Sequence, residues 1–215
     1  MQHKCLFIGA PLIAIVALLG LSVDIHTNAK SIEELENFSN EDEILGWMRQ
    51  KMAYLKSSRP TAVNLTNALI EVEQKMIDAL QKNADDSDKK KVLCNAVLEY
   101  SEFMLERDVS DNKAIGKFGA DAILKKTGKD KINLVTICNT GSLATAGYGT
   151  ALGVARSLQE MEKLESISAL ETRPYNQGSR LTAFEIKEEK MPGGQLICDS
   201  SAGALMQVRT HNKAI

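Results

Sequence analysis

A change in hydrophobic periodicity near residue 128 is the feature that most constrains the fold of this 215-residue chain. Before it, apolar residues recur at steps of three and four, as between Leu65 and Leu80, which predicts amphipathic helices. Residues 132–138 instead form a short continuous apolar run with β-branched side chains, which predicts a strand buried on both faces. We therefore expect a helical N-terminal domain over residues 1–128 and a second domain over residues 129–215.

Within the helical part, the spacing predicts two short amphipathic helices in residues 31–56 and a longer one after Pro60. The charged run at residues 85–91 has two interpretations, an interaction patch or a solvated loop. The loop is favoured, because its acidic residues would precede a helix whose apolar face lies on residues 92–104, and the helix dipole favours negative charge there.

The N-terminal apolar run is ambiguous by composition alone. Residues 5–23 contain no charged side chain, which is typical of a signal peptide or a membrane anchor. However, Gly9, Pro11 and Gly20 interrupt the run, and no clear cleavage site precedes Asp24. A buried helix needs the same residue types, so the residues alone leave both interpretations open.

The second domain has the pattern of an α/β protein. Two further strands are predicted at residues 166–171 and 195–198, and Ser179 is predicted to cap a helix that continues through Ile186. Strands that alternate with helices form parallel βαβ units. The expected fold class is therefore α/β, with the helical N-terminal domain followed by a parallel-sheet domain.

Polar segments follow the three predicted strands, at residues 138–141, 173–178 and 199–200. Because ligand sites in parallel sheets lie beyond the carboxyl ends of the strands, we expect these segments to converge on one crevice. The thiol of Cys138 and the carboxylate of Asp199 would then face one ligand, together with an amide and arginines.

Each of these residues also has a purely structural interpretation. Cys138 has no histidine near it in sequence and is by type more often a packed thiol, and Asp199 is as often the cap of a helix at residues 200–206. The arginines at 59, 173 and 180 can form ion pairs instead of binding phosphate. Four glycines between Gly141 and Gly153 fit a phosphate-binding loop or the close packing of a helix about equally well.

Composition excludes several classes of protein. The chain has 26 Lys and Arg against 28 Asp and Glu, a net charge of -2, which argues against nucleic-acid binding through bulk charge. Its four cysteines form no Cys-x-x-Cys pair and only three histidines are present, which argues against a structural metal site. Such sparse cysteine use suits a reducing compartment.

Several longer runs carry a resemblance to a known family. They are RPTAVNL at 59–65, NKAIGKFGA at 112–120, CNTGSLATAGYGTALGVARSL at 138–158, ETRPYNQGSRLTAFE at 171–185 and ICDSSAGALM at 197–206, after an initial Gly9-Ala10-Pro11. In this order they resemble the methylthioribose-1-phosphate isomerases of methionine salvage. That family shares a superfamily with regulatory subunits of translation initiation factor 2B.

The resemblance implies conversion of 5-methylthioribose 1-phosphate to 5-methylthioribulose 1-phosphate without a metal or organic cofactor. By the motif positions, the family's catalytic cysteine falls on Cys138 and its proton-donating aspartate on Asp199. Its substrate contacts fall on Gly9, Ala10, Arg59 and Gln177. An apolar closed crevice would favour the protonated form that Asp199 needs in order to act as an acid.

The resemblance implies that the second domain is an incomplete Rossmann-like parallel-sheet domain. It also implies a homodimer in the cytoplasm, with a nuclear pool allowed, whose partner is a sugar phosphate and neither nucleic acid nor membrane. Residues 9–23 align with a buried helix of the family, which favours that interpretation over a signal or an anchor.

Two departures from the family pattern bear on activity. Ile8 stands where the family has an arginine that contacts the substrate phosphate. Family chains also begin earlier and continue well past the position of Asp199, where an Asn-Lys pair binds substrate; residues 212–213 do not align with that pair. We therefore expect a truncated form or an incomplete gene model, with an exposed edge strand near Cys138, weak stability and little or no turnover.

Two alternative functions remain open. One is a non-catalytic regulatory subunit like the translation-factor relatives, which lack the cysteine and aspartate pair. The other is a sugar-phosphate isomerase of the same family that acts on a ribose bisphosphate.

Overall fold

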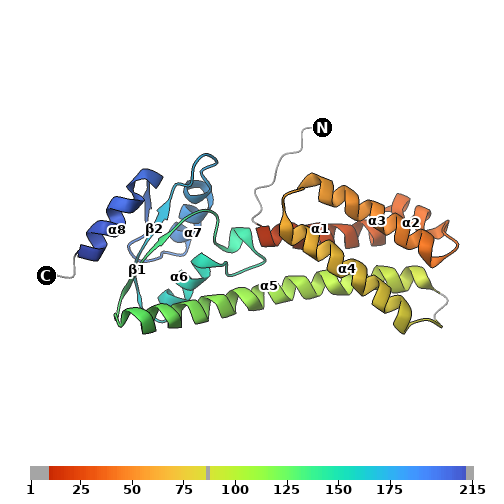
Figure 1. The fold of residues 1–215 in the computed structure, drawn as a ribbon, viewed down its shortest axis with the longest axis horizontal. Coiled ribbons are helices and arrows are strands. Elements are labelled where there is room, and N and C mark those ends of the chain that lie inside the picture. The colour runs from red at the N-terminus through yellow and green to blue at the C-terminus, as the bar shows by residue number, and fades with distance from the viewer. Residues whose placement is uncertain (1–9, 86–87, 212–215) are drawn as a thin grey trace. The chain divides into compact units, whose positions relative to one another are not determined.

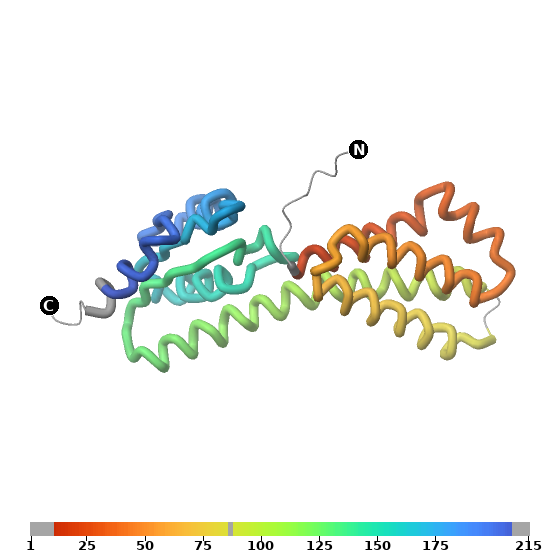
Figure 2. The backbone as a smooth tube through the Cα atoms, turned by 45° about the horizontal axis from the view of Figure 1, so that its top comes forward, coloured from red at the N-terminus to blue at the C-terminus, as the bar shows by residue number. Residues whose placement is uncertain are grey.

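The computed structural model describes residues 10–85 and 88–211 of the chain (Figure 1). It separates into two compact units, which divide between Asp108 and Val109 inside helix α5 (Lys89–Thr127). Helix α5 is continuous, and its first part belongs to one unit and its second part to the other (Figure 2). The last helix before the sheet thus ends at Thr127, next to the predicted boundary at residue 128. The second unit begins earlier, at Val109, and so includes the second half of α5.

The first unit is helical throughout its described residues, as predicted. Its elements are α1 (Ala10–Thr27), α2 (Ala29–Glu36), α3 (Glu41–Ser58), α4 (Val63–Lys82) and the first part of α5. Asparagines cap two of them: the side chain of Asn28 accepts from the N–H of Lys30, and that of Asn40 accepts from the N–H of Glu43. Asp88 accepts from the N–H of Lys91 in the first turn of α5, which supports the loop interpretation of the charged run.

The apolar N-terminal segment contributes to the core of this unit. Five apolar side chains of α1 are buried: Ala14, Ile15, Leu18, Leu21 and Ile25. All of these except Ile15 lie in a core that includes Met48, Val72 and Met76, each of which is fully buried. The prediction of a buried helix here is confirmed. Among the described residues, no single helix passes a length and hydropathy test for a membrane span, and the bent pair Pro11–Thr27 and Ala29–Glu36, at 70°, passes it by length and composition only.

The second unit contains a three-stranded parallel sheet in the order β1 (Ile132–Thr136), β2 (Leu164–Leu170) and β3 (Gln195–Ile197). Leu134 pairs with Ile167, and Ala169 pairs with Leu196. Helix α6 (Ala151–Glu160) contacts both β1 and β2, and α7 (Ala183–Glu188) precedes β3. The expected helical domain followed by a partial Rossmann-like parallel sheet is therefore confirmed.

Glycines allow α5 and α6 to approach each other closely. A Cβ atom at Gly116 would lie 2.8 Å from the carbonyl oxygen of Gly153, and one at Gly119 would lie 2.7 Å from a methyl group of Val154. This contact explains why the end of α5 packs with the second unit, and it supports the packing interpretation of Gly153.

Two details of the second unit differ from the predictions. Strand β1 is not buried on both faces: Asn133 is exposed, and Leu134 and Val135 are half-buried. It is an edge strand of the described sheet, paired only with β2. Ser179 does not cap a helix, because it lies inside a short π-helical segment, Gly178–Thr182, that continues directly into α7. Its hydroxyl donates to the carbonyl of Asn176.

Candidate active site

The three strands of the second unit place two predicted residues, Cys138 and Asp199, and one that was not predicted, Thr172, at one edge of the sheet. Cys138, Thr172 and Asp199 each lie two residues beyond the end of β1, β2 and β3, respectively. Because the strands are parallel, their carboxyl ends meet at the same edge. Hydrogen bonds then join the three residues directly.

Cys138 is held at three atoms. Its Sγ donates to Oε1 of Gln177 at 2.8 Å, its backbone N–H donates to Oγ1 of Thr172 at 2.8 Å, and its carbonyl accepts from Oγ1 of Thr182 at 2.6 Å. Its φ of 76° lies in the left-handed region, which side chains other than glycine adopt rarely. The thiol thus has a fixed position beside the amide that the resemblance assigns to substrate binding.

Asp199 accepts two backbone hydrogen bonds. Its Oδ1 accepts from the N–H of Thr172 and its Oδ2 from the N–H of Arg173, each at 2.8 Å. Asp199 does not cap a helix. It is the first residue of the 3-10 turn Asp199–Ser201, which leads into α8 (Ala202–His211), and Cys198 occupies the capping position. A carboxylate has about four acceptor positions, so each oxygen retains a site for a proton.

Cys138, Gln177 and Asp199 are thus brought together, and all three are half-buried. The other predicted substrate contacts belong to the first unit. Arg59 follows the end of α3, where its N–H donates to the carbonyl of Lys56. Ala10 is the first residue of α1, and Gly9 lies outside the described residues, as does Ile8.

The glycine-rich segment after Cys138 is a tight loop that closes on itself. The carbonyl of Thr140 accepts from the N–H groups of Thr150 and Leu152 at 2.9 and 3.2 Å. Gly149 has a φ of 78°, and a Cβ there would lie 2.6 Å from the backbone of Gly141. Close packing therefore accounts for these two glycines.

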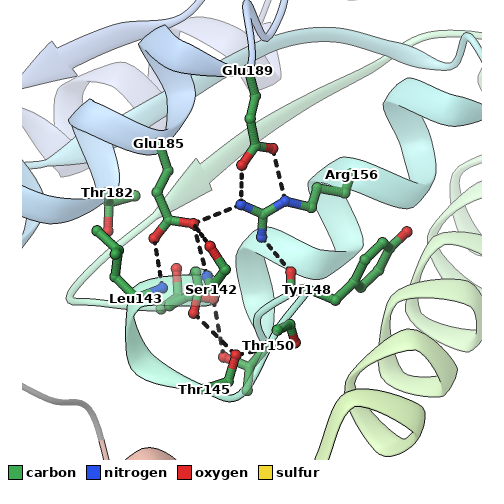
Figure 3. Close-up of polar contacts among 12 residues, drawn as sticks. Ser142, Leu143, Thr145, Tyr148, Thr150, Arg156, Thr182, Glu185 and Glu189 are labelled. Atoms are coloured by element: carbon green, nitrogen blue, oxygen red, sulfur yellow. Dashed lines mark hydrogen bonds and ion pairs between the residues drawn. The ribbon is translucent and has the colours of Figure 1, made fainter.

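A buried ion network holds this loop against α7 (Figure 3). Arg156 donates from Nη2 to Glu185 at 2.6 Å and from Nε to Glu189 at 2.7 Å, and its Nη1 donates to the carbonyl of Tyr148. Glu185, only 4% exposed, also accepts from the backbone N–H groups of Ser142 and Leu143. Burial opposes the charge on Arg156, but hydrogen bonds to Glu189 and Glu185 raise its pKa above the ordinary value. The network fixes the loop that follows Cys138.

Sequence reasoning missed the residues that position the site. Thr172 and Thr182 contact the backbone of Cys138, and Arg156 and Glu185 fix its loop. All four lie inside the long motif runs at 138–158 and 171–185. The one available signal was Arg156, a charged residue among apolar and small residues in the first seven positions of α6.

The chain thus belongs to the class of proteins in which a helical unit precedes a Rossmann-like α/β unit. Its candidate site has a thiol and a carboxylate at the carboxyl edge of the parallel sheet. A family model described as the Initiation factor 2 subunit family matches residues 7–213. The chain belongs to this family.

Its relatives include both enzymes and translation factors. It is 46% identical over 201 residues to a methylthioribose-1-phosphate isomerase of Nematostella vectensis, covering 94% of this chain and 53% of the relative. It is likewise 46% identical over 200 residues to the Zea mays protein of that name, covering 93% and 51%. The chain therefore spans about half the length of the curated relatives it matches.

Two solved structures are also similar. One is 5-methylthioribose 1-phosphate isomerase from Pyrococcus horikoshii, with a TM-score of 0.73 and 29% identity over 93% of this chain and 50% of that one. The other is the translation initiation factor eIF-2B subunit delta from A. fulgidus, with a TM-score of 0.69 and 32% identity over 94% and 53%.

Proposed function

We propose that the strand-end site belongs to an aldose-ketose isomerase that converts 5-methylthioribose 1-phosphate to 5-methylthioribulose 1-phosphate in methionine salvage. The observation that carries this proposal is the joining of Cys138 and Asp199 through Thr172 at one edge of the sheet. The names of the curated relatives support the choice of substrate.

Asp199 is the general acid and base in this proposal. The phosphate blocks the anomeric oxygen of the sugar, so the ring opens only when an acid protonates the ring oxygen as its bond to carbon 1 breaks. The hydrogen on carbon 2 then moves to carbon 1, and the carbon 2 hydroxyl returns a proton to the carboxylate. The overall reaction is an isomerisation and needs no oxidant or reductant.

Cys138 stabilises the charge that develops at the reacting carbons. Its thiol is already oriented by Gln177, so little rearrangement is needed in the transition state. Both Cys138 and Asp199 are half-buried, and the bound sugar completes the water-poor surroundings that the acid requires. Gln177, which already contacts the thiol, is the substrate contact that belongs to the second unit. The substrate contacts that the resemblance assigns to Gly9, Ala10 and Arg59 of the first unit stay a prediction.

The proposal is tested by ³¹P NMR of the purified chain with 5-methylthioribose 1-phosphate under single-turnover conditions. The anomeric phosphate of the substrate and the primary phosphate ester of the product give separate signals. Substituting Cys138→Ser or Asp199→Asn should lower the rate by at least about 10²-fold, the usual contribution of a positioned proton-transfer group. The exposed residues Cys198 and Asp121 supply the matched controls Cys198→Ser and Asp121→Asn, which should leave the rate unchanged.

Unchanged turnover in either site variant would remove that residue from the mechanism. The sequence predicts turnover well below that of a full-length relative, so enzyme and substrate are used at equal concentrations. No product from the unsubstituted chain under these conditions would contradict the proposed activity for this chain.

A regulatory subunit is the second candidate function, and the similarity to the eIF-2B delta subunit favours it. The retained thiol and carboxylate argue against it, since a binding subunit does not need them. Stable binding to purified initiation factor 2, in a chain without isomerase turnover, would support this second candidate.

The proposal extends to assembly and location. A homodimer in the cytoplasm, with a nuclear pool, is expected; sedimentation velocity and imaging of the tagged protein test these two points.

A further inference from the structure

Thr172 has a backbone conformation that is unfavourable for its residue type. Its φ is 60°, in the left-handed region, where a β-branched residue is a clear outlier. Glycine adopts this conformation without a steric penalty. A strained residue next to a candidate site indicates that the side chain itself is used there.

The Thr172 hydroxyl serves as both acceptor and donor. Its Oγ1 accepts from the N–H of Cys138 at 2.8 Å and donates to the carbonyl of Leu170 at 3.1 Å. Glycine at this position would leave the Cys138 N–H without this partner. The hydroxyl therefore fixes the backbone of Cys138 relative to the end of β2.

The backbone of the same residue holds Asp199. The consecutive N–H groups of Thr172 and Arg173 point at the two carboxylate oxygens, each at 2.8 Å. Consecutive N–H groups around a left-handed residue form a concave anion-binding arrangement. The left-handed conformation of Thr172 is thus part of how the carboxylate is held.

The segment around Thr172 is constrained from its other side. The α-carbon of Gly178 packs so closely on β2 that an added Cβ would lie 1.7 Å from the carbonyl oxygen of Leu170. The loop between Thr172 and Gly178 therefore has little freedom to relax, and the two hydrogen bonds of the Thr172 hydroxyl act between fixed partners.

We propose that Thr172 is the positioning residue that sets the placement of Cys138 relative to Asp199. One residue ties together the ends of all three strands: its hydroxyl holds Cys138 after β1, and its N–H holds Asp199 after β3. It need not touch the substrate. The catalytic consequence rests on the proposed isomerase function, whereas the placement of the Cys138 thiol does not.

Three substitutions in the full 215-residue chain separate the hydroxyl from the backbone. Thr172→Gly removes the hydroxyl and relieves the strain, Thr172→Val removes it and keeps the shape, and Thr172→Ser retains it. Thr127 provides a matched control, because its Oγ1 likewise donates to a carbonyl, that of Ile123, and accepts from an N–H, that of Lys129. Thr127→Val therefore removes the same pair of bonds away from the site.

The first measurement is the rate at which iodoacetamide alkylates Cys138, followed by peptide mass spectrometry. Thr172→Gly and Thr172→Val should alkylate about tenfold faster than the unsubstituted chain, as expected when a thiol loses the equivalent of one restraining hydrogen bond. Thr172→Ser and Thr127→Val should remain within about threefold of the unsubstituted chain.

The second measurement is isomerase kinetics. The Gly and Val variants should lose about 10²-fold in kcat, the effect of misplacing a catalytic group by roughly 1 Å, with KM within about threefold. The Ser variant should restore kcat. A merely structural role predicts the opposite for Thr172→Gly, which would fold at least as well and turn over at the unsubstituted rate.

The proposal is overturned if Thr172→Gly matches the unsubstituted chain in alkylation, or if Thr172→Ser is as impaired as Thr172→Gly. If Thr172→Val does not fold, the comparison of Gly with Ser decides. If the unsubstituted chain has no turnover, the proposed function fails, and the alkylation rates still decide the positioning role of Thr172.

Discussion

At the scale of single residues, a few backbone and side-chain bonds determine what the chemistry-bearing groups can do. Cys138 and Thr172 both adopt positive φ values, and each has a hydrogen-bonding role that explains why the conformation is kept. Asp199 uses its two oxygens to hold a loop and keeps acceptor positions for a proton.

Ile8 gives a prediction at this scale. The resemblance implies that an arginine stands at this position in relatives and contacts the substrate phosphate, and a charge-assisted hydrogen bond of this kind contributes about 1.5 to 3 kcal/mol. Substituting Ile8→Arg should therefore raise kcat/KM for 5-methylthioribose 1-phosphate by at least about tenfold. Ile8→Lys supplies the positive charge without a planar guanidinium that can donate two hydrogen bonds to phosphate, and should give a smaller gain. If Ile8→Arg leaves kcat/KM unchanged, this position does not bind phosphate in the chain.

Asp24 in the first unit gives a pH-dependent prediction. Burial opposes its ionisation, but hydrogen bonds from Lys51 and Ser31 and the charge of Lys51 together lower its pKa below 3.8. Because the folded pKa is below the unfolded one, the carboxylate stabilises the fold above the unfolded pKa, and this contribution is lost as pH falls through the folded pKa.

Thermal unfolding of Asp24→Asn should therefore show a deficit in the free energy of unfolding of about 1 kcal/mol or less at pH 7, and this deficit should shrink as the pH falls through the lowered folded pKa. In a Lys51→Met background, the Asp24→Asn substitution should have little further effect on stability, since Asp24 and Lys51 form one ion pair at 2.9 Å. A deficit of the same size at every pH would contradict this account.

At the scale of elements, two close approaches organise the second unit: α5 against α6 at Gly116, and the π-helical segment against β2 at Gly178. The ion network of Arg156, Glu185 and Glu189 then fixes the loop between β1 and α6 (Figure 3). These contacts place the segments after β1 and β2 side by side.

Gly178 and Gly46 form a matched pair for a stability prediction. A Cβ at Gly178 would lie 1.7 Å from a backbone oxygen, whereas one at Gly46, inside α3, meets nothing within 4 Å. Gly178→Ala should lower the free energy of unfolding by about 3 kcal/mol or more, because the chain must shift to admit the methyl group. Gly46→Ala should raise it by roughly 0.5 to 1 kcal/mol through helix propensity. Denaturant unfolding measures both, and equal effects would contradict the packing described at Gly178.

The helices and strands were largely predictable from the sequence. The side-chain contacts that fix the loops after the strands were not. Periodicity located the long helices and all three strands, because burial of apolar faces dominates there. Ser179 was misassigned, since a serine before an apolar segment looks like a cap even when the preceding turn is already helical. The role of Thr172 could not be predicted, because no local sequence pattern marks a threonine with positive φ.

At the scale of the whole chain, the sequence spans about half the length of the curated relatives it matches. Strands β1 and β3 are the edges of the described sheet. Ile137, directly after β1, and Leu196, within β3, are about half exposed, at 54% and 49%. An edge strand next to Cys138 was expected from the sequence, and the described residues confirm it. The hydrogen bonds that join Cys138 to Asp199 through Thr172 nonetheless form entirely within the second unit.

The most direct test is a crystal structure of the chain with 5-methylthioribulose 1-phosphate bound. Carbons 1 and 2 of the sugar should lie between Sγ of Cys138 and the carboxyl group of Asp199, each within about 3.5 Å of one of them, as a reactive geometry requires. A sugar phosphate bound away from both groups, or contacting only one of them, would contradict the assignment of this strand-end site.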